Sequence, residues 1–241
     1  MKLDVLTLFP QIITPALQTG ILKRIQESGE LVVNTYNIRD WTTDRHKTVD
    51  DYPYGGGAGM ILKPEPIFSA VSAMHPTEDT EIIYLTPQGV PLTQSIVEGL
   101  SIKSHLIFIC GRYKGIDERI RKKIVTKEIS IGDYVLSGGE IAALVLIDAI
   151  GRILPGALGD FESAHEDSFS KDFLDHPHYT RPVEFEGMKV PEVLLSGHHE
   201  NIKKWRYTQA IIRTAERRPD IIKNLELTDE ELDILREDKN N

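Results

Sequence analysis

The sequence predicts an α/β fold in which a mostly parallel sheet is flanked by helices. Short apolar runs of β type alternate with segments of helical periodicity along most of the chain, which is the pattern of α/β domains. Three of the apolar runs also end directly in loops that contain glycine or proline. The C-terminal part shows helical periodicity without such strands, so a smaller, mainly helical domain is expected there.

Each element of this fold is predicted from a local pattern of apolar residues. The predicted strands are Lys2–Leu8, Leu31–Tyr36, Glu81–Leu85, His105–Cys110 and Glu128–Leu136. The predicted helices between them are Ile12–Ser28, Pro66–His75, Thr93–Ile102 and Ile116–Ile124, whereas residues 37–64 show no clean periodicity. Helices are also expected over His198–Arg218 and Thr228–Leu235, the second with a capping box formed by Thr228 and Glu231.

The stretch from Ile131 to Gly156 contains the features that point most directly to a site. Gly138 and Gly139 precede a nearly all-apolar segment, Ile141–Ile150, after which Arg152 is an isolated cation. Adjacent glycines suit a backbone that approaches a ligand closely. Ligands of open α/β sheets bind outside the carboxyl ends of the strands. The three strand-end loops, 86–89, 111–115 and 137–139, are therefore expected to form one shared pocket.

Composition excludes several classes of protein. The chain has 241 residues, of which 40% are hydrophobic and 27% charged, with a net charge of -9. These values are typical of an ordinary folded protein without a global positive field. The one cysteine, Cys110, ends an apolar run, so we expect a buried core thiol and a reducing, cytoplasmic setting. The longest uninterrupted apolar run, Ile141–Ile147, is too short to cross a membrane.

Glycine is concentrated in the segment Asp51–Met60, DYPYGGGAGM. Closely spaced glycines expose backbone N–H groups that could approach a phosphate. The segment nevertheless fails the P-loop and GxGxxG patterns, and no clear strand precedes it. A flexible surface loop and a loop that wraps close to a nucleotide are equally compatible with this composition.

Two charged segments lie toward the C-terminus. Residues 160–175 carry six acids against one lysine, which suits an exposed linker or a mobile segment that delivers a general base. Helix 198–218 carries six Lys and Arg against two Glu, which suits a solvated face or a nucleic-acid contact.

The expected domains are 1–159, a linker 160–176, and 177–241. A metal site from His165, His176 and His178 is the less favoured interpretation of those histidines, and no metal site is predicted.

Nine motifs stand in the order seen in one known family. They are PYGGGAGM, LTPQG, CGRYKGIDERI, IGDYVLSGGE, GRILPG, DSF, HYTRP, VPEVLLSGHH and IKKWR. Taken together, they resemble the bacterial tRNA (guanine-N1)-methyltransferases of the SPOUT class, over essentially the whole chain. Lys114 and Ala142 depart from the usual motifs, which have glutamate and proline at these places.

The resemblance implies that residues 1–159 form a methyltransferase domain with a C-terminal trefoil knot, and that 177–241 bind tRNA. It also implies a homodimer whose active sites are shared between subunits. S-adenosylmethionine would bind in the knot, and Mg²⁺ has been linked to the family, although the sequence offers no convincing ligands for it. The cofactor-binding residues implied are Tyr84, Leu85, Thr86, Pro87, Gly111, Tyr113, Gly115, Ile131, Gly132, Asp133, Tyr134, Val135, Leu136, Gly138 and Gly139.

The implied reaction is methylation of N1 of the guanine at tRNA position 37, directly 3′ of the anticodon. N1 must lose its proton while charge develops on O6, which asks for a base and a nearby cation. By motif, Asp167 is the implied base and Arg152 the implied cation. Substrate contacts are implied for Gly55, Gly56, Gly57, Gly59, Met60, Ser168, Asp175, His178, Arg181, Lys203 and Arg206. The alternatives are a SPOUT enzyme acting on another RNA and a non-catalytic nucleotide-binding module.

Overall fold

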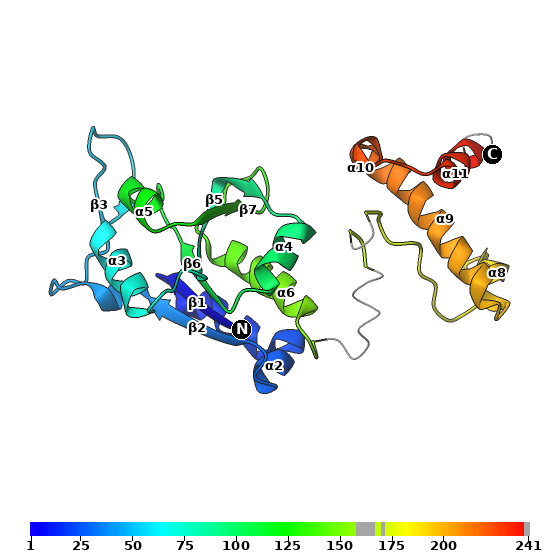
Figure 1. The fold of residues 1–241 in the computed structure, drawn as a ribbon. Coiled ribbons are helices and arrows are strands. Elements are labelled where there is room, and N and C mark those ends of the chain that lie inside the picture. The colour runs from blue at the N-terminus through cyan, green and yellow to red at the C-terminus, as the bar shows by residue number, and fades with distance from the viewer. Residues whose placement is uncertain (158–166, 170–171, 239–241) are drawn as a thin grey trace. The chain divides into compact units, whose positions relative to one another are not determined.

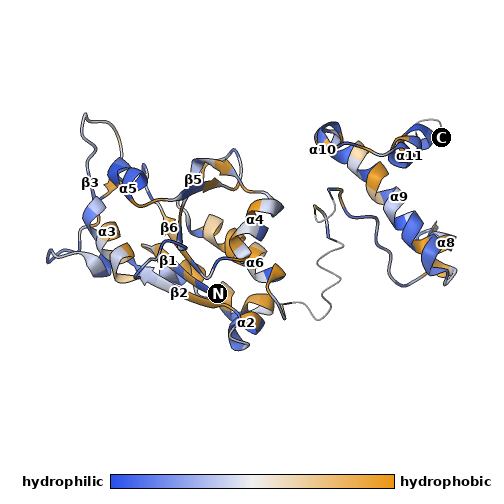
Figure 2. Ribbon diagram, viewed as in Figure 1, coloured by the Kyte–Doolittle hydropathy of each residue, from blue (hydrophilic) through white to orange (hydrophobic). Residues whose placement is uncertain are grey.

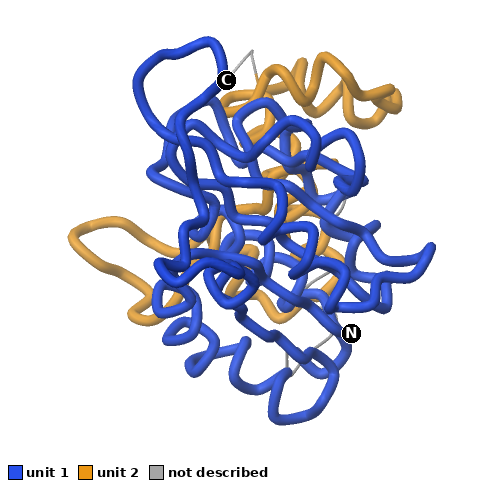
Figure 3. The backbone as a smooth tube through the Cα atoms, turned by 90° about the vertical axis from the view of Figure 1, so that its left-hand side faces the viewer, with its two compact units in different colours: residues 1–161 blue, residues 162–241 orange. Residues whose placement is uncertain are grey.

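The computed structural model describes residues 1–157, 167–169 and 172–238. The chain divides into two compact units, Met1–Phe161 and Glu162–Asn241, which Figure 3 colours separately. Most of the acidic segment 160–175, including His165, lies outside the described residues.

Unit 1 is built on a five-stranded sheet with the order β2-β1-β6-β5-β7 (Figure 1). All four neighbouring pairs of strands are parallel. The expected α/β fold with a mostly parallel sheet is therefore confirmed. The strands are β1 (Lys2–Thr7), β2 (Val32–Asn37), β5 (Glu81–Pro91), β6 (His105–Cys110) and β7 (Lys127–Ser130), and two short strands, β3 (Asp50–Asp51) and β4 (Ile61–Leu62), pair separately.

Helices cover both faces of the sheet because successive strand residues point to opposite sides. Leu106 and Phe108 belong to one apolar cluster, and Ile107 and Ile109 belong to the other. Hydrophobic residues accordingly gather on the inner strands and on α6 (Figure 2). The first cluster is closed by α1 (Pro10–Ile13), η1 (Ala16–Gln18), α2 (Gly20–Glu27), α4 (Gln94–Ser101) and α6 (Glu140–Ile153). The second is closed by η2 (Ile38–Trp41), α3 (Pro64–Ala73) and α5 (Glu118–Lys123).

Three predicted elements are wrong in their extent. The strand expected over Glu81–Leu85 continues to Pro91 as β5. The strand expected over Glu128–Leu136 ends at Ser130. There the Ser130 hydroxyl accepts a hydrogen bond from the Gly132 N–H at 3.2 Å, which turns the chain out of the sheet. The long helix expected after β1 is instead divided into α1, η1 and α2, with Pro15 and Gly20 at the breaks. The apolar periodicity continues through both breaks, so periodicity alone does not reveal them.

A buried carboxylate lies near the amino ends of β1 and β6. Asp4 is fully buried and accepts hydrogen bonds from Asn34 Nδ2 at 2.8 Å and from His105 Nε2 at 2.9 Å, while Lys2 Nζ lies 2.7 Å away. Burial raises the pKa of Asp4, but the hydrogen bonds from Lys2, Asn34 and His105 outweigh it and hold this pKa below its ordinary value. The cluster therefore stabilises the ionised form in the folded protein.

Replacement of Asp4 by asparagine is expected to lower the free energy of unfolding by roughly 2 kcal/mol near neutral pH, because charge-assisted hydrogen bonds are lost. A carboxyl whose pKa is depressed on folding contributes stability above its unfolded pKa and loses it as the pH falls through the folded pKa. The difference in the free energy of unfolding between wild type and Asp4→Asn should thus be constant above about pH 5 and become smaller below about pH 4. Urea unfolding at a series of pH values measures it, and a gap that widens in acid would contradict this role.

Unit 2 contains a short hairpin of β8 (Glu184–Phe185) and β9 (Met188–Lys189), followed by helices. The predicted capping box is confirmed: Thr228 N–H donates to Glu231 Oε2 at 2.6 Å, and Glu231 N–H donates to Thr228 Oγ1 at 3.3 Å. Tyr207 donates to Glu231 Oε1 at 2.5 Å; burial and this carboxylate raise the pKa of Tyr207 to about 12. The helices are α8 (Glu192–Leu195), α9 (His199–Arg217), α10 (Pro219–Asn224) and α11 (Asp229–Asp238). Among the described residues, no helix is long and apolar enough to cross a membrane.

Candidate active site

The loops at the carboxyl ends of β5, β6 and β7 surround one cavity in unit 1. Its volume is about 350 Å³, within the range of roughly 300–1,000 Å³ typical of small-molecule sites. The shared pocket expected from the sequence is therefore present. It is lined by Tyr84, Leu85, Thr86, Pro87, Gln88, Gly111, Arg112, Tyr113, Lys114, Gly115, Ile129, Ser130, Ile131, Gly132, Tyr134, Val135, Leu136, Ser137, Gly138, Gly139 and Ala142.

All the residues implied for cofactor binding line this cavity except Asp133, which is exposed beside it. Their role in binding stays a prediction, whereas their convergence is a property of the fold. Seven further lining residues were not named as cofactor residues, although four of them lie in the three loops expected to form the pocket and the other three lie in β7 and α6. These are Gln88, Arg112, Lys114, Ile129, Ser130, Ser137 and Ala142.

Close approaches of the backbone shape the walls of the cavity. The pairing of β5 with β7 shifts register between Leu85 and Val90, so residues 86–89 leave the ladder, and 86–88 line the cavity. At Gly89 an added Cβ would overlap the backbone of Ile129. At Gly139 an added Cβ would lie 2.8 Å from the Cα of Cys110. Only glycine lets these chain segments pass at such distances.

A buried ion pair ties the loops together beneath the cavity. Glu140 is 1% exposed and lies 3.2 Å from Arg112 Nε, and it also accepts a hydrogen bond from the Thr7 hydroxyl at 2.7 Å. Gly139 N–H donates to the Gly111 carbonyl at 3.0 Å. The guanidinium of Arg112 also lies 4.5 Å from the ring centre of Phe9. This network joins the carboxyl ends of β1 and β6 to the start of α6.

Cys110 lies under the same loops but is not placed for chemistry. It is fully buried, as expected from the sequence. Burial raises the pKa of the thiol well above its ordinary value, and the charge of Glu140 raises it further, while Arg112 acts in the opposite direction. A thiol kept protonated in this way is a poor nucleophile.

The glycine-rich loop lies against the cavity loops through backbone hydrogen bonds. Lys114 N–H donates to the Met60 carbonyl, and Leu62 N–H donates to the Gly115 carbonyl, both at 3.0 Å. Gly55, Gly56, Gly57 and Gly59 all have positive φ angles. The loop implied for substrate binding is thus attached to a loop that lines the cavity.

Arg152 is distant from the glycine pair of the same chain. It lies in the last turn of α6, and twelve helical residues at about 1.5 Å each put it roughly 18 Å along the helix from Glu140. Arg152 does not line the cavity. It shares one helical face with Ile141, Val145 and Asp148. Ile141 and Val145 are 50% and 41% exposed, so α6 is not buried on every side.

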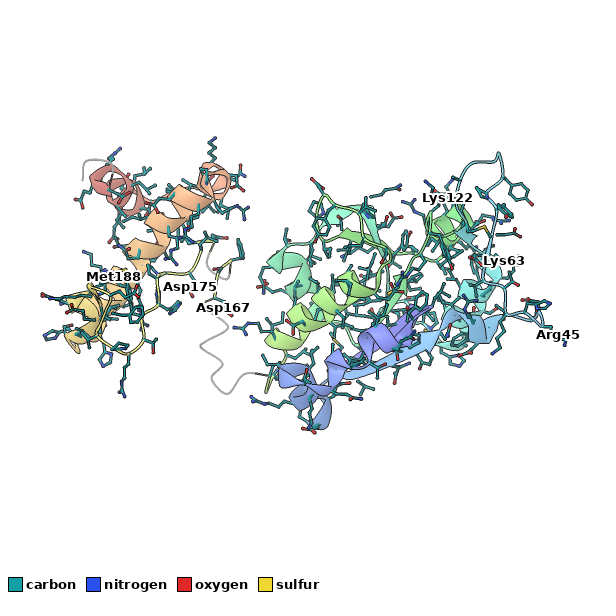
Figure 4. The ribbon with its side chains drawn as sticks, turned by 180° about the vertical axis from the view of Figure 1, so that it is seen from behind. Arg45, Lys63, Lys122, Asp167, Asp175 and Met188 are labelled. Atoms are coloured by element: carbon teal, nitrogen blue, oxygen red, sulfur yellow. The ribbon has the colours of Figure 1, made fainter. Side chains whose placement is uncertain are left out.

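The remaining implied residues lie in unit 2. Asp167 and Ser168 are half-buried, and Asp167 and Asp175 lie on the same stretch of chain (Figure 4). Asp175 N–H donates to Ser168 Oγ at 2.9 Å, and Asp175 Oδ2 lies 2.6 Å from His178 Nε2. Exposed cations implied for substrate binding are Arg181 in the segment before β8, and Lys203 and Arg206 on α9.

One group in the described part of the chain has the composition of a metal site. The ligand atoms of Asp175, His176 and His178 lie within 4.8 Å of one another. Imidazoles do not suit Mg²⁺, which prefers oxygen ligands in octahedral geometry. This group therefore does not fit the Mg²⁺ linked to the resembled family, and no catalytic step is assigned to that ion.

A parallel sheet with glycine loops around a cavity at its carboxyl ends is typical of α/β proteins that bind small, nucleotide-like ligands. Comparison with known proteins makes this class more specific. The family model described as tRNA (Guanine-1)-methyltransferase TrmD matches residues 1–224. The chain belongs to this family, which is of the SPOUT class.

Curated relatives match over nearly the whole chain, and each is described as a tRNA (guanine-N(1)-)-methyltransferase. The protein from Dictyoglomus turgidum is 52% identical over 239 residues, which cover 99% of this chain and 97% of that protein. The protein from Anoxybacillus flavithermus is 54% identical over 235 residues, covering 96% and 95%. The protein from Staphylococcus epidermidis is 52% identical over 235 residues, covering 98% and 96%.

Proposed function

We propose that this chain transfers a methyl group from S-adenosylmethionine to N1 of a guanine in tRNA, at position 37. The observation that carries the proposal is the match to tRNA (guanine-N1)-methyltransferases over nearly the full length of both chains. That match includes every loop around the cavity. Because the substrate is tRNA, we further propose a cytoplasmic location.

The cavity fits S-adenosylmethionine as its ligand. Its volume of about 350 Å³ suits a nucleoside with a short chain. A Cβ at Gly111, Gly138 or Gly139 would lie within 3 Å of other protein atoms, so a side chain at any of them would distort the wall. Tyr134, Val135 and Leu136 line the cavity and are exposed, so they can stack against an apolar ligand surface.

The chain's own residues then have two tasks in the reaction. Bound S-adenosylmethionine would supply an electrophilic methyl group on a sulfonium sulfur, which leaves as a neutral thioether. As the N1–C bond forms, the Asp167 carboxylate takes the N1 proton and becomes a carboxylic acid. Arg152 donates hydrogen bonds to O6 and stabilises the negative charge that develops there.

The position of Arg152 supports a homodimer with shared active sites. An arginine about 18 Å along α6 from the glycine pair is poorly placed for the cavity of its own protomer. The exposed apolar residues Ile141 and Val145 lie on the same face of α6 as Arg152. If two copies pack antiparallel through this face, each Arg152 approaches the cavity end of the partner's helix.

A mixing experiment tests the shared site. Arg152→Ala is expected to be inactive alone, as is Ser137→Trp, in which the exposed Ser137 at the cavity wall is replaced by a ring that blocks it. Equal mixing after subunit exchange should restore about one quarter of wild-type activity, since half of the dimers then hold one intact site. No recovery, despite heterodimers detected by native mass spectrometry, would place Arg152 in the site of its own protomer.

We also propose the finer fold implied by the family. It comprises a trefoil knot at the C-terminal end of unit 1 and a tRNA-binding domain in 177–241, and a linker, 160–176, joins this domain to residues 1–159. The close passages at Gly89 and Gly139 support chain crossings around the cavity. The exposed Lys203 and Arg206 on α9 support contact with the phosphates of a tRNA stem.

Incubation with methyl-labelled S-adenosylmethionine and an unmodified tRNA transcript tests the function. The transcript carries guanine at position 37 and at the preceding position. Digestion should yield labelled 1-methylguanosine from position 37, and a transcript with adenine at 37 should remain unlabelled. Label at another position or in another RNA would favour a different SPOUT activity, and cofactor binding without transfer would favour a non-catalytic module.

A further inference from the structure

Lys114 lies where the cofactor cavity meets the glycine-rich loop. It belongs to the loop 111–115 and lines the cavity, and its N–H donates to the Met60 carbonyl at 3.0 Å. The side chain is exposed. Any substrate that contacts both the cavity and the glycine-rich loop must therefore pass close to Lys114.

The aliphatic part of this side chain lies across Gly59. Its Cγ, Cε and Cδ atoms lie 3.0, 3.4 and 3.7 Å from the point that a Cβ of Gly59 would occupy. Because Gly59 has no Cβ and a φ of +97°, the lysine stem can rest on the loop backbone. The stem is thus supported along its length, which lowers the entropy cost of holding the ammonium group in one place.

The charge of Lys114 has no counterpart in the described part of the protein. The neighbouring cations are paired: Arg112 with Glu140, Arg119 with Asp117, and Arg121 with Glu128. Lys114 forms no ion pair with any described residue. In a chain with a net charge of -9, an unpaired, supported ammonium beside a ligand cavity is suited to an external anion.

We propose that Lys114 is a phosphate-binding residue, which contacts the RNA backbone next to the guanine that enters the cavity. This inference rests on the proposed function. RNA brings one negative charge with each nucleotide, whereas S-adenosylmethionine, with a sulfonium, an ammonium and a carboxylate, carries a net positive charge. The ammonium of Lys114 therefore attracts the RNA and not the cofactor as a whole.

The test measures tRNA binding by fluorescence anisotropy at several salt concentrations, with Lys114→Met and the charge reversal Lys114→Glu. Lys114→Met is expected to weaken binding about fivefold at low salt, and Lys114→Glu more strongly. A phosphate contact to a single strand contributes about 0.7 to the slope of log affinity against log salt. The ratio of the wild-type to the Lys114→Met affinity should thus fall about threefold between about 50 and 200 mM salt.

Lys103→Met is the matched control. Lys103 precedes β6 at the amino ends of the strands, whereas the cavity lies at their carboxyl ends, and Lys103 pairs with Glu81. It should bind tRNA with the wild-type affinity and salt slope. A wild-type slope in Lys114→Met would overturn the proposal, as would a change confined to the KM for S-adenosylmethionine, which would assign the ammonium to the cofactor carboxylate. Binding does not require turnover, so a wild type that binds tRNA without methylating it would overturn the proposed function alone.

Discussion

Exchange of Asp167 for asparagine is expected to lower kcat by about 10²- to 10⁴-fold, the range that a positioned general base contributes. Asparagine keeps the size of the side chain but cannot accept the N1 proton. The KM for tRNA and the affinity for S-adenosylmethionine should change little, because the interaction is made only as the proton moves. Single-turnover methyl transfer with tRNA, together with calorimetric titration of the cofactor, measures the two effects separately.

Asp172→Asn is the control for this substitution, because Asp172 is an exposed acid of the same segment. It should retain nearly wild-type turnover. Equal losses in both variants would indicate that the acidity of the segment matters and not one base. Near-wild-type turnover in Asp167→Asn would show that another residue is the general base. The fold and the family of the chain would be unaffected by that result.

Removal of the Glu140 carboxylate is expected to destabilise unit 1 strongly. Glu140→Ala leaves the Arg112 charge and the Thr7 hydroxyl without their acceptor. Breaking a buried ion pair by removing one partner costs about 3–5 kcal/mol, and the lower end applies because the Arg112 side chain is 17% exposed. Urea unfolding should therefore show a loss of about 3 kcal/mol. Affinity for S-adenosylmethionine should also fall, since the loops of the cavity lose their common anchor.

Two comparisons isolate the ion pair. Glu98→Ala, an exposed glutamate on α4, should change the free energy of unfolding by about 0.5 kcal/mol or less. The double variant Arg112→Met and Glu140→Leu should be less destabilised than Glu140→Ala, because no buried charge is left alone. Additive losses in the double variant would show that the two side chains act independently.

The location of the cavity was predictable because it follows from a general property of parallel sheets. Residues 86–89 interrupt β5 after Leu85, and loops 111–115 and 137–139 follow β6 and β7, which run in the same direction, so all three meet at one end of the sheet. The polar side chains that anchor these loops were not predictable. Thr7 and Glu140 are 133 residues apart, and apolar periodicity carries no information about which distant polar side chains will pair.

Other limits of prediction have equally local causes. The strand expected through Leu136 ends at Ser130 because a serine hydroxyl turns the chain, although several apolar residues follow as far as Leu136. Arg152 and Asp167 were assigned by motif order alone, and no periodicity or spacing indicates their roles. The same is true of the knot and the homodimer, which stay predictions that rest on the family.

The strand order has a consequence for how the chain folds during synthesis. β1 is made first, and its partner β2 follows soon after, but its other neighbour, β6, begins only at His105. At about 5–20 residues per second, the ribosome needs roughly 5–20 s to produce that stretch. Throughout this time one edge of β1 remains unpaired and apolar, which is the condition under which nascent chains aggregate. The sheet of unit 1 therefore cannot close around β1 until β6, which ends at Cys110, has been made.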